Sequence, residues 1–130
     1  MDSIRKLTGR SSAPPEVLVP ILVAVGGALV FMLVGLLRWQ LDGDAGLVRF
    51  PIVIGVLELL VAGGLLAALR PSRLIAIVVF LLVALLHLLT VLNDGPIWVR
   101  VVFSVLSAAH VYAVVLLNTG PARGHLGGTV

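Results

Sequence analysis

The sequence predicts an all-α fold, a polytopic integral membrane bundle of four helices. Hydrophobic residues make up 60% of the 130 residues and charged residues only 12%, whereas soluble domains average about 45–50% apolar and about 25% charged residues. Four apolar runs of roughly 20 residues are each long enough to cross the hydrocarbon core of a bilayer. Turn-forming residues separate these runs. Since four spans use most of the chain, no folded domain outside the membrane is expected.

The first residues are expected to form a basic cytoplasmic tail, residues 1–15, before the chain enters the membrane. Its Ser, Thr and Gly content is typical of a disordered segment beside anionic lipid. The first span is expected at about 16–37, with Pro20 near its start, where proline costs a helix least. This apolar run exceeds a signal-peptide core, and no Ala-x-Ala site follows it, so a cleaved signal peptide is disfavoured.

The remaining spans are expected at about 51–69, 74–92 and 97–117, which places the bundle at residues 16–118. Residues 38–50 are expected to form the longest loop, because Asp42-Gly43 and Asp44 are turn-forming residues. The basic turn at 70–73 is so short that the second and third spans must form an antiparallel helical hairpin. Residues 119–130 are rich in glycine and are expected to remain a flexible cytoplasmic tail.

Basic residues predict the orientation of the bundle in the plasma (inner) membrane. With alternating spans, six lie on the side of the two termini: Arg5, Lys6, Arg10, Arg70, Arg73 and Arg123. The other side has only three, and acidic residues accompany them: Arg38, Arg49 and Arg100. The positive-inside rule therefore places both termini in the cytoplasm. Trp39 and Trp98 would share the outer interface, where tryptophan is enriched.

Three ionisable residues are expected to meet within the membrane. From the rise of an α-helix, Glu58 lies about 10 Å, His87 about 9 Å and Arg100 about 5 Å below the outer ends of their spans. A long arginine side chain could extend down to the carboxylate or up to the headgroups. Because ionisable groups at membrane depth are costly, a polar cluster of these three residues is the main candidate site.

Four further polar residues are secondary candidates. Thr90 lies near His87 on the third span, and Ser104 and Ser107 share a helix face with Arg100, as residues at helix contacts in lipid do. His110 lies about 20 Å from the outer end of its span, so it is expected to be hydrogen-bonded across helices outside the cluster.

Several kinds of chemistry are disfavoured. The sequence has no cysteine, and the intramembrane candidates Glu58, His87 and His110 fall at depths that do not suit a common metal ion, so neither a metal site nor a cofactor is expected. No catalytic residues are assigned, because no base lies beside a serine at a suitable depth except His110. The net charge of +3 comes from residues that flank spans, and nucleic-acid binding is not expected.

Three roles remain open for the cluster. It could be a buried polar contact that fixes the register of three helices, a contact with a partner subunit, or a proton relay or substrate-binding carboxylate in a small transporter. The transporter role predicts that Glu58→Gln abolishes transport while leaving the protein folded.

The preference for arginine over lysine, the Arg-Pro-x-Arg turn and the ending Val-Tyr-Ala-Val-Val-Leu-Leu-Asn-Thr-Gly-Pro-Ala-Arg resemble the small four-span membrane proteins of actinobacteria. Most proteins of this kind have no assigned activity, and some are accessory subunits of larger envelope complexes such as lipid importers and respiratory complexes, so the resemblance implies a subunit of this kind. The main expectation is therefore a subunit that docks onto such a complex and stabilises or regulates it. The alternative is a proton-coupled transporter or permease with Glu58 as the coupling carboxylate. The small multidrug transporters are a poor match, because their essential glutamate lies in the first span.

Overall fold

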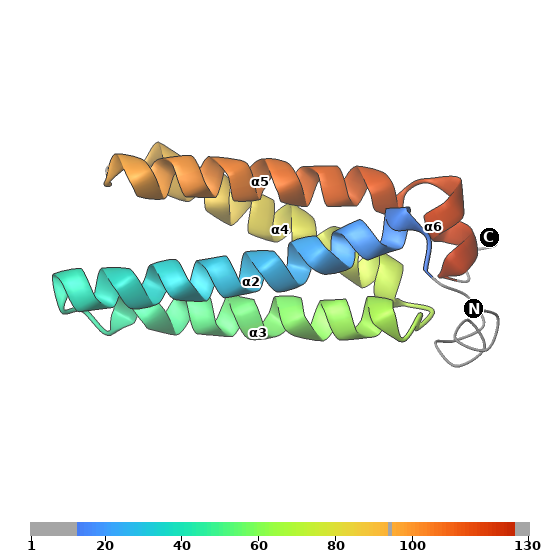
Figure 1. The fold of residues 1–130 in the computed structure, drawn as a ribbon, viewed down its shortest axis with the longest axis horizontal. Helices are drawn as coiled ribbons and strands as arrows, with labels where there is room; N and C mark the ends of the chain where they lie inside the picture. Colours follow the sequence, from blue (N-terminus) through green and yellow to red (C-terminus); the bar gives the residue numbers. More distant parts are fainter. Residues whose placement is uncertain (1–12, 94, 127–130) are drawn as a thin grey trace, which may run out of the picture.

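A computed structural model describes residues 13–93 and 95–126 and confirms the all-α fold class (Figure 1). Four long apolar helices pack as a bundle, and a short helix follows them. The helices are α2 (Pro15–Asp42), α3 (Gly46–Leu66), α4 (Ser72–Leu92), α5 (Ile97–Leu117) and α6 (Gly120–His125). Most of the basic tail expected at residues 1–15 lies outside the described residues.

The bundle consists of two helical hairpins. Helix α2 pairs with α3 and helix α4 pairs with α5, and the hairpins join mainly through α2 and α5 (Figure 1). One end of the bundle carries the α2–α3 and α4–α5 connections, together with the exposed side chains of Trp39 and Trp98. We call it the tryptophan end. The other carries the α3–α4 connection and α6, and we call it the terminal end.

Each of the four long helices is long and apolar enough to cross a membrane. Their outward faces carry large aliphatic side chains, such as Leu22, Leu60 and Leu82, which are more than half exposed. A soluble protein of this size would not leave so much contiguous apolar surface in water. The fold therefore supports a multi-pass membrane protein with these side chains facing lipid.

Two apolar clusters fill the interior. The cluster toward the terminal end includes Leu65, Phe80 and Leu117, all fully buried. The cluster toward the tryptophan end is centred on the rings of Phe31 and Phe103, whose centroids lie 5.4 Å apart in an edge-to-face arrangement. Buried polar side chains lie between the two clusters, and they form the candidate site described below.

The loop expected at residues 38–50 is mostly helical. Helix α2 continues to Asp42 and α3 begins at Gly46, so only a tight turn separates them. Gly43 ends α2 with a φ of 74°, a left-handed conformation that favours glycine, and its N–H donates to Trp39 O. The Asp44 carboxylate then accepts the Gly46 N–H at 2.9 Å. The turn lies at the predicted residues Asp42-Gly43 and Asp44, but the connection between the two helices is much shorter than the predicted loop.

Pro51 lies inside α3 instead of beginning it. A proline within a helix removes one backbone hydrogen bond and leaves the carbonyl four residues earlier without its usual partner. Here that carbonyl, Leu47 O, and the Pro51 ring face Gly35 of α2. A Cβ atom built on Gly35 would lie 2.7 Å from the ring and 2.9 Å from the carbonyl oxygen. Glycine in α2 thus lets the irregular turn of α3 pack closely.

The segment expected to be a flexible tail at 119–130 contains helix α6, which corrects that expectation for the described residues. Pro121 lies in the first turn, where proline favours the start of a new helix as much as the end of the previous one. Ala122 is fully buried and Leu126 is 1% exposed, and both pack into the apolar cluster of the terminal end with Val17. Burial of these two side chains orders the segment.

Candidate functional site

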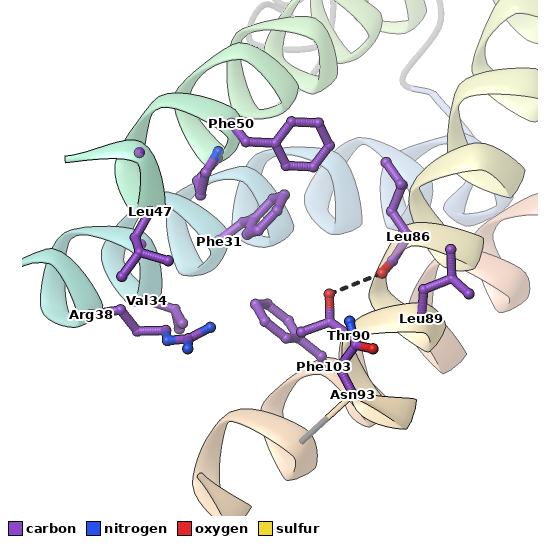
Figure 2. A pocket seen from close by; sticks show the side chains of 13 residues that line it. Phe31, Val34, Arg38, Leu47, Phe50, Leu86, Leu89, Thr90, Asn93 and Phe103 are labelled. Carbon is purple, nitrogen blue, oxygen red and sulfur yellow. Dashed lines mark hydrogen bonds between the residues drawn. The ribbon is translucent and has the colours of Figure 1, made fainter. Parts of the chain in front are cut away.

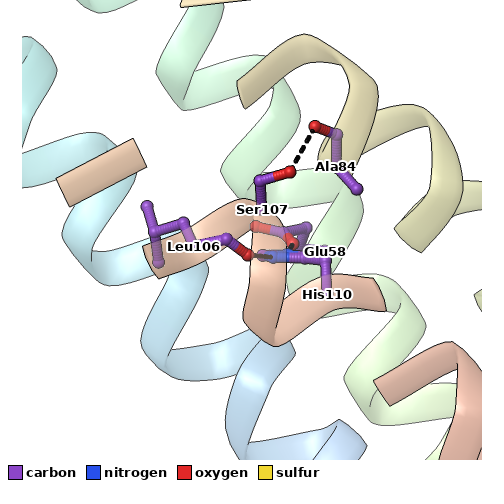
Figure 3. A network of polar contacts seen from close by, with 5 residues as sticks. All are labelled: Glu58, Ala84, Leu106, Ser107 and His110. Atoms are coloured by element: carbon purple, nitrogen blue, oxygen red, sulfur yellow. Dashed lines mark hydrogen bonds and ion pairs between the residues drawn. The ribbon is translucent and has the colours of Figure 1, made fainter. Parts of the chain in front are cut away.

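A carboxylate and two imidazoles meet in the interior of the bundle. Glu58 comes from α3, His87 from α4 and His110 from α5, and all three side chains are fully buried. We call them the polar centre. Figure 3 shows Glu58 and His110 pointing toward each other between the helices. Three of the four long helices therefore contribute an ionisable group to one site in the interior.

Glu58 and His110 form a direct hydrogen bond between Oε1 and Nε2. The second ring nitrogen, Nδ1, lies 2.6 Å from the backbone oxygen of Leu106. A carbonyl oxygen can only accept, so Nδ1 must carry a proton. Nε2 then either accepts a proton from a neutral Glu58 acid or, in an imidazolium ion, donates one to the carboxylate. In both cases one proton is shared between the two residues.

The shared proton makes the pair neutral as a whole. A neutral acid with a neutral imidazole has no net charge, and neither has a carboxylate with an imidazolium ion. Burying an isolated charge in hydrocarbon is far more costly than burying a neutral hydrogen-bonded pair. The contact between Glu58 and His110 therefore explains how a glutamate can lie deep inside an apolar bundle.

Helix α2 contributes a glycine to the polar centre. A Cβ atom built on Gly27 would lie 2.9 Å from His110 Cε1, 3.3 Å from Nε2 and 3.7 Å from Glu58 Oε2. Any larger residue would push against an imidazole that is held at both nitrogens. The contact of Gly27 with His110 depends on how α2 packs against α5, which the sequence alone does not reveal.

His87 occupies an aromatic environment. Its ring stacks on Phe103 with centroids 5.0 Å apart and planes 5° from parallel, and the Phe31 ring meets it edge-on at 4.9 Å. The His110 ring lies 5.3 Å away by centroid. Within the described part of the chain, neither ring nitrogen of His87 has a hydrogen-bond partner, and Glu58 Oε2 has none either. Besides the hydrogen-bonded atoms, the polar centre thus contains three buried polar atoms that have no partner among the described residues.

The structure corrects the expected membership of the cluster. His110, expected to lie outside it, is the partner of Glu58. Because α3 begins at Gly46, Glu58 lies about 18 Å from the start of its helix, and His110 lies about 20 Å from the start of α5. The two depths match. The expected separation was wrong because the second span was assumed to begin at Pro51.

Arg100 does not reach the polar centre. Its Nε donates to Val91 O at 2.9 Å, and the residue is exposed near the α4–α5 connection. A long side chain near a helix end can satisfy its guanidinium group on free carbonyls at the membrane boundary, without the cost of moving a charge inward. The arginine therefore stabilises the end of the hairpin.

Of the three secondary candidates with a hydroxyl group, Ser107 alone bonds to another helix. Its hydroxyl donates to Ala84 O of α4 at 2.9 Å, close to the polar centre (Figure 3). The hydroxyl of Thr90 donates to Leu86 O, and that of Ser104 donates to Arg100 O, each within its own helix. Ser107 thus links α5 to α4, whereas His110 links α5 to α3.

A cavity of about 280 Å³ lies beside the polar centre at the tryptophan end (Figure 2). Phe31, Phe50 and Phe103 line it, and the first and last of these also pack on His87. Arg38, Thr90 and Asn93 supply polar groups nearer the helix ends. The cavity therefore combines an aromatic wall with a cationic group.

The described residues include no group of three or more His, Cys, Asp or Glu side chains arranged to hold a metal ion. In comparisons with known proteins, the chain matches no family model, no curated protein and no solved structure. The evidence about function therefore comes from the contacts and the exposed faces of the described residues.

Proposed function

We propose that the protein is a non-enzymatic membrane subunit that docks through its lipid-facing surface onto a larger envelope complex, which it stabilises or regulates. The observation that carries this proposal is the outward face of α5. Ser104 and Ala108 are exposed there, one turn apart, with Tyr112 one turn further. Elsewhere, exposed side chains in the middle of the spans are mostly Leu and Val. Small residues on an outward face allow a helix of another protein to approach closely.

The distribution of polar groups supports the same role. Glu58 pairs with His110 inside the bundle, and Ser107 bonds to α4. The interior groups therefore hold α3, α4 and α5 to one another, which leaves the outer surface for a partner. In this proposal the bundle sits in the plasma membrane with the terminal end, which carries Arg70, Arg73 and Arg123, facing the cytoplasm. The small actinobacterial proteins that the sequence resembles suggest the same kind of role.

The test combines purification with a matched pair of variants. The native chain is purified in a gentle detergent, and co-eluting chains are quantified by mass spectrometry. Ala108→Leu adds bulk on the proposed face of α5, whereas Val78→Leu adds bulk on an exposed face of α4. We expect a stoichiometric partner that A108L loses and V78L retains, with unchanged thermal stability. A wild-type protein that elutes alone or as a homo-oligomer would refute the proposal, as would equal loss in both variants.

A second candidate is a small proton-coupled transporter or permease with Glu58 as the coupling carboxylate. The specific observation in its favour is the proton that Glu58 and His110 share. The His110 ring lies next to the His87 ring, and His87 packs on Phe31 and Phe103, which line the cavity, so the shared proton is close to the cavity. In this role the pair would load and release that proton as the cavity binds and releases a substrate.

Proton flux into proteoliposomes under a pH gradient tests the transporter. Glu58→Gln should abolish the flux while circular dichroism and elution volume stay unchanged, and Ser104→Ala should have no effect. Wild-type flux no greater than that of empty liposomes would count against this candidate and leave the accessory subunit as the better account.

A further inference from the structure

The cavity at the tryptophan end is lined by two kinds of surface. Three phenylalanine rings and aliphatic side chains form its inner part, and the guanidinium group of Arg38 lies at its outer part (Figure 2). An apolar pocket with one charged group at its rim fits a ligand that is apolar at one end and anionic at the other. Neither an uncharged chain nor a free ion would use both surfaces.

Arg38 is placed to receive an anion. Its Nε is buried and has no hydrogen-bond partner within residues 13–93 and 95–126. The Asp42 carboxylate on the same helix lies at 4.0 Å from Nε, measured to Oδ2, which is within ion-pair range but beyond hydrogen-bond distance. The Arg38 side chain as a whole is 29% exposed, so its terminal guanidinium nitrogens can donate to an anionic oxygen supplied by a ligand in the cavity.

The position of the cavity indicates where the ligand comes from. Arg38 is next to Trp39 in the last turn of α2, and Asn93 lies at the end of α4. Tryptophan side chains mark the level of the lipid headgroups. The guanidinium group is therefore at the level of lipid phosphates, and Phe31 and Phe103 are at the level of the acyl chains.

From these observations we infer that the cavity binds an anionic phospholipid, whose phosphate contacts Arg38 and whose glycerol and first chain carbons pack on Phe31, Phe50 and Phe103. The amide of Asn93, which lines the same cavity, can donate to the remaining headgroup oxygens, whereas the Thr90 hydroxyl already donates to Leu86 O. The bound lipid fills the gap between the two hairpins at this end. This inference does not depend on the proposed docking function.

Native mass spectrometry of the full chain in detergent micelles tests the inference. The probe is phosphatidylglycerol, compared with a diacylglycerol of the same chains and with inorganic phosphate. We expect one phosphatidylglycerol to bind per chain, with much weaker binding of diacylglycerol and no competition from inorganic phosphate. Equal binding of diacylglycerol, or full competition by inorganic phosphate, would overturn the inference.

Three variants connect the binding to this cavity. Arg38→Gln should weaken phosphatidylglycerol binding about tenfold, because it removes a charge-assisted hydrogen bond. Arg49→Gln, an exposed arginine that does not line the cavity, should leave the affinity unchanged. Asp42→Asn should strengthen binding, because it removes the competing carboxylate without reaching the core. Equal weakening of binding in R38Q and R49Q would show an adventitious electrostatic attraction only and would refute the site. The site would also be refuted if neither R38Q nor D42N changed the affinity.

Discussion

Gly27 of α2 lies directly against the imidazole of His110 on α5, so close that a Cβ atom on the glycine would sit 2.9 Å from Cε1 of the ring. The ring cannot move aside easily, since Nδ1 is bonded to Leu106 O and Nε2 to Glu58. Three helices thus converge on one hydrogen bond. The neighbouring Gly26 points away from the bundle, and a Cβ atom there would meet nothing within 4 Å.

Gly27→Ala should therefore destabilise the fold. Overpacking by one methyl group costs about 1–3 kcal/mol when the neighbour is held in place. Detergent-induced unfolding, followed by circular dichroism, measures the loss. Gly26→Ala is the matched control, and it should be neutral or slightly stabilising, because alanine has the higher helix propensity. Equal stability of the two variants would show that the imidazole is free to shift.

His87→Phe should leave stability unchanged or raise it. The imidazole stacks on Phe103 and has no hydrogen-bond partner among the described residues, so a phenyl ring keeps the stacking and removes the cost of two buried nitrogens. His110→Phe should destabilise the protein instead, because it leaves Glu58 buried and unpaired. Thermal melting in detergent compares the two variants. A clear loss of stability in H87F would mean that the His87 nitrogens have a polar partner in the membrane, such as water.

Ser107→Ala should cost about 0.5–1.5 kcal/mol, the usual net contribution of a hydrogen bond, or somewhat less in a membrane interior. The reason is its bond to Ala84 O, which joins α5 to α4. Ser104→Ala removes a bond within α5 only and should have an effect near zero. Unfolding free energies of the two variants provide the measurement. If the two losses are the same, the Ser107 bond does not stabilise the helix pair.

The apolar runs in the sequence were enough to predict the four helices. The hydrophobic stretches ending at Leu92 and Leu117 match the ends of α4 and α5, because an uninterrupted apolar run has to cross the bilayer as a helix. The beginning of α3 was less predictable. Pro51 is a common helix start, and only its packing against Gly35, a tertiary contact, allows it inside the helix.

The wrong start predicted for α3 also led to a wrong prediction of the candidate site. Moving the start of α3 from Pro51 to Gly46 lowers Glu58 by about 7–8 Å, from the depth expected of His87 to the depth of His110. The polar centre contains Glu58 and His87, as expected, but its third residue is His110 and not Arg100. Depth estimated from one helix end is reliable only when that end is known. The position of Arg100 also depends on a free carbonyl, Val91 O, which composition does not reveal.

The central claim is that the hydrogen bond between Glu58 and His110 holds α3 and α5 together as a neutral pair. A double-mutant cycle with Glu58→Leu, His110→Leu and the double variant isolates this bond. Each single variant leaves one polar group buried without its partner, whereas the double variant leaves neither. Leucine suits both sites, because the surroundings are apolar and its volume is similar.

Unfolding free energies of the wild-type protein and the three variants, measured in the same mixed micelles, test the claim most directly. We predict that each single variant is less stable than the double variant or equal to it, with a coupling energy of about 1–2 kcal/mol, near the upper end for hydrogen bonds between membrane helices. Single losses that add to the double loss within about 0.5 kcal/mol would contradict the account, because the two residues would then stabilise the bundle independently.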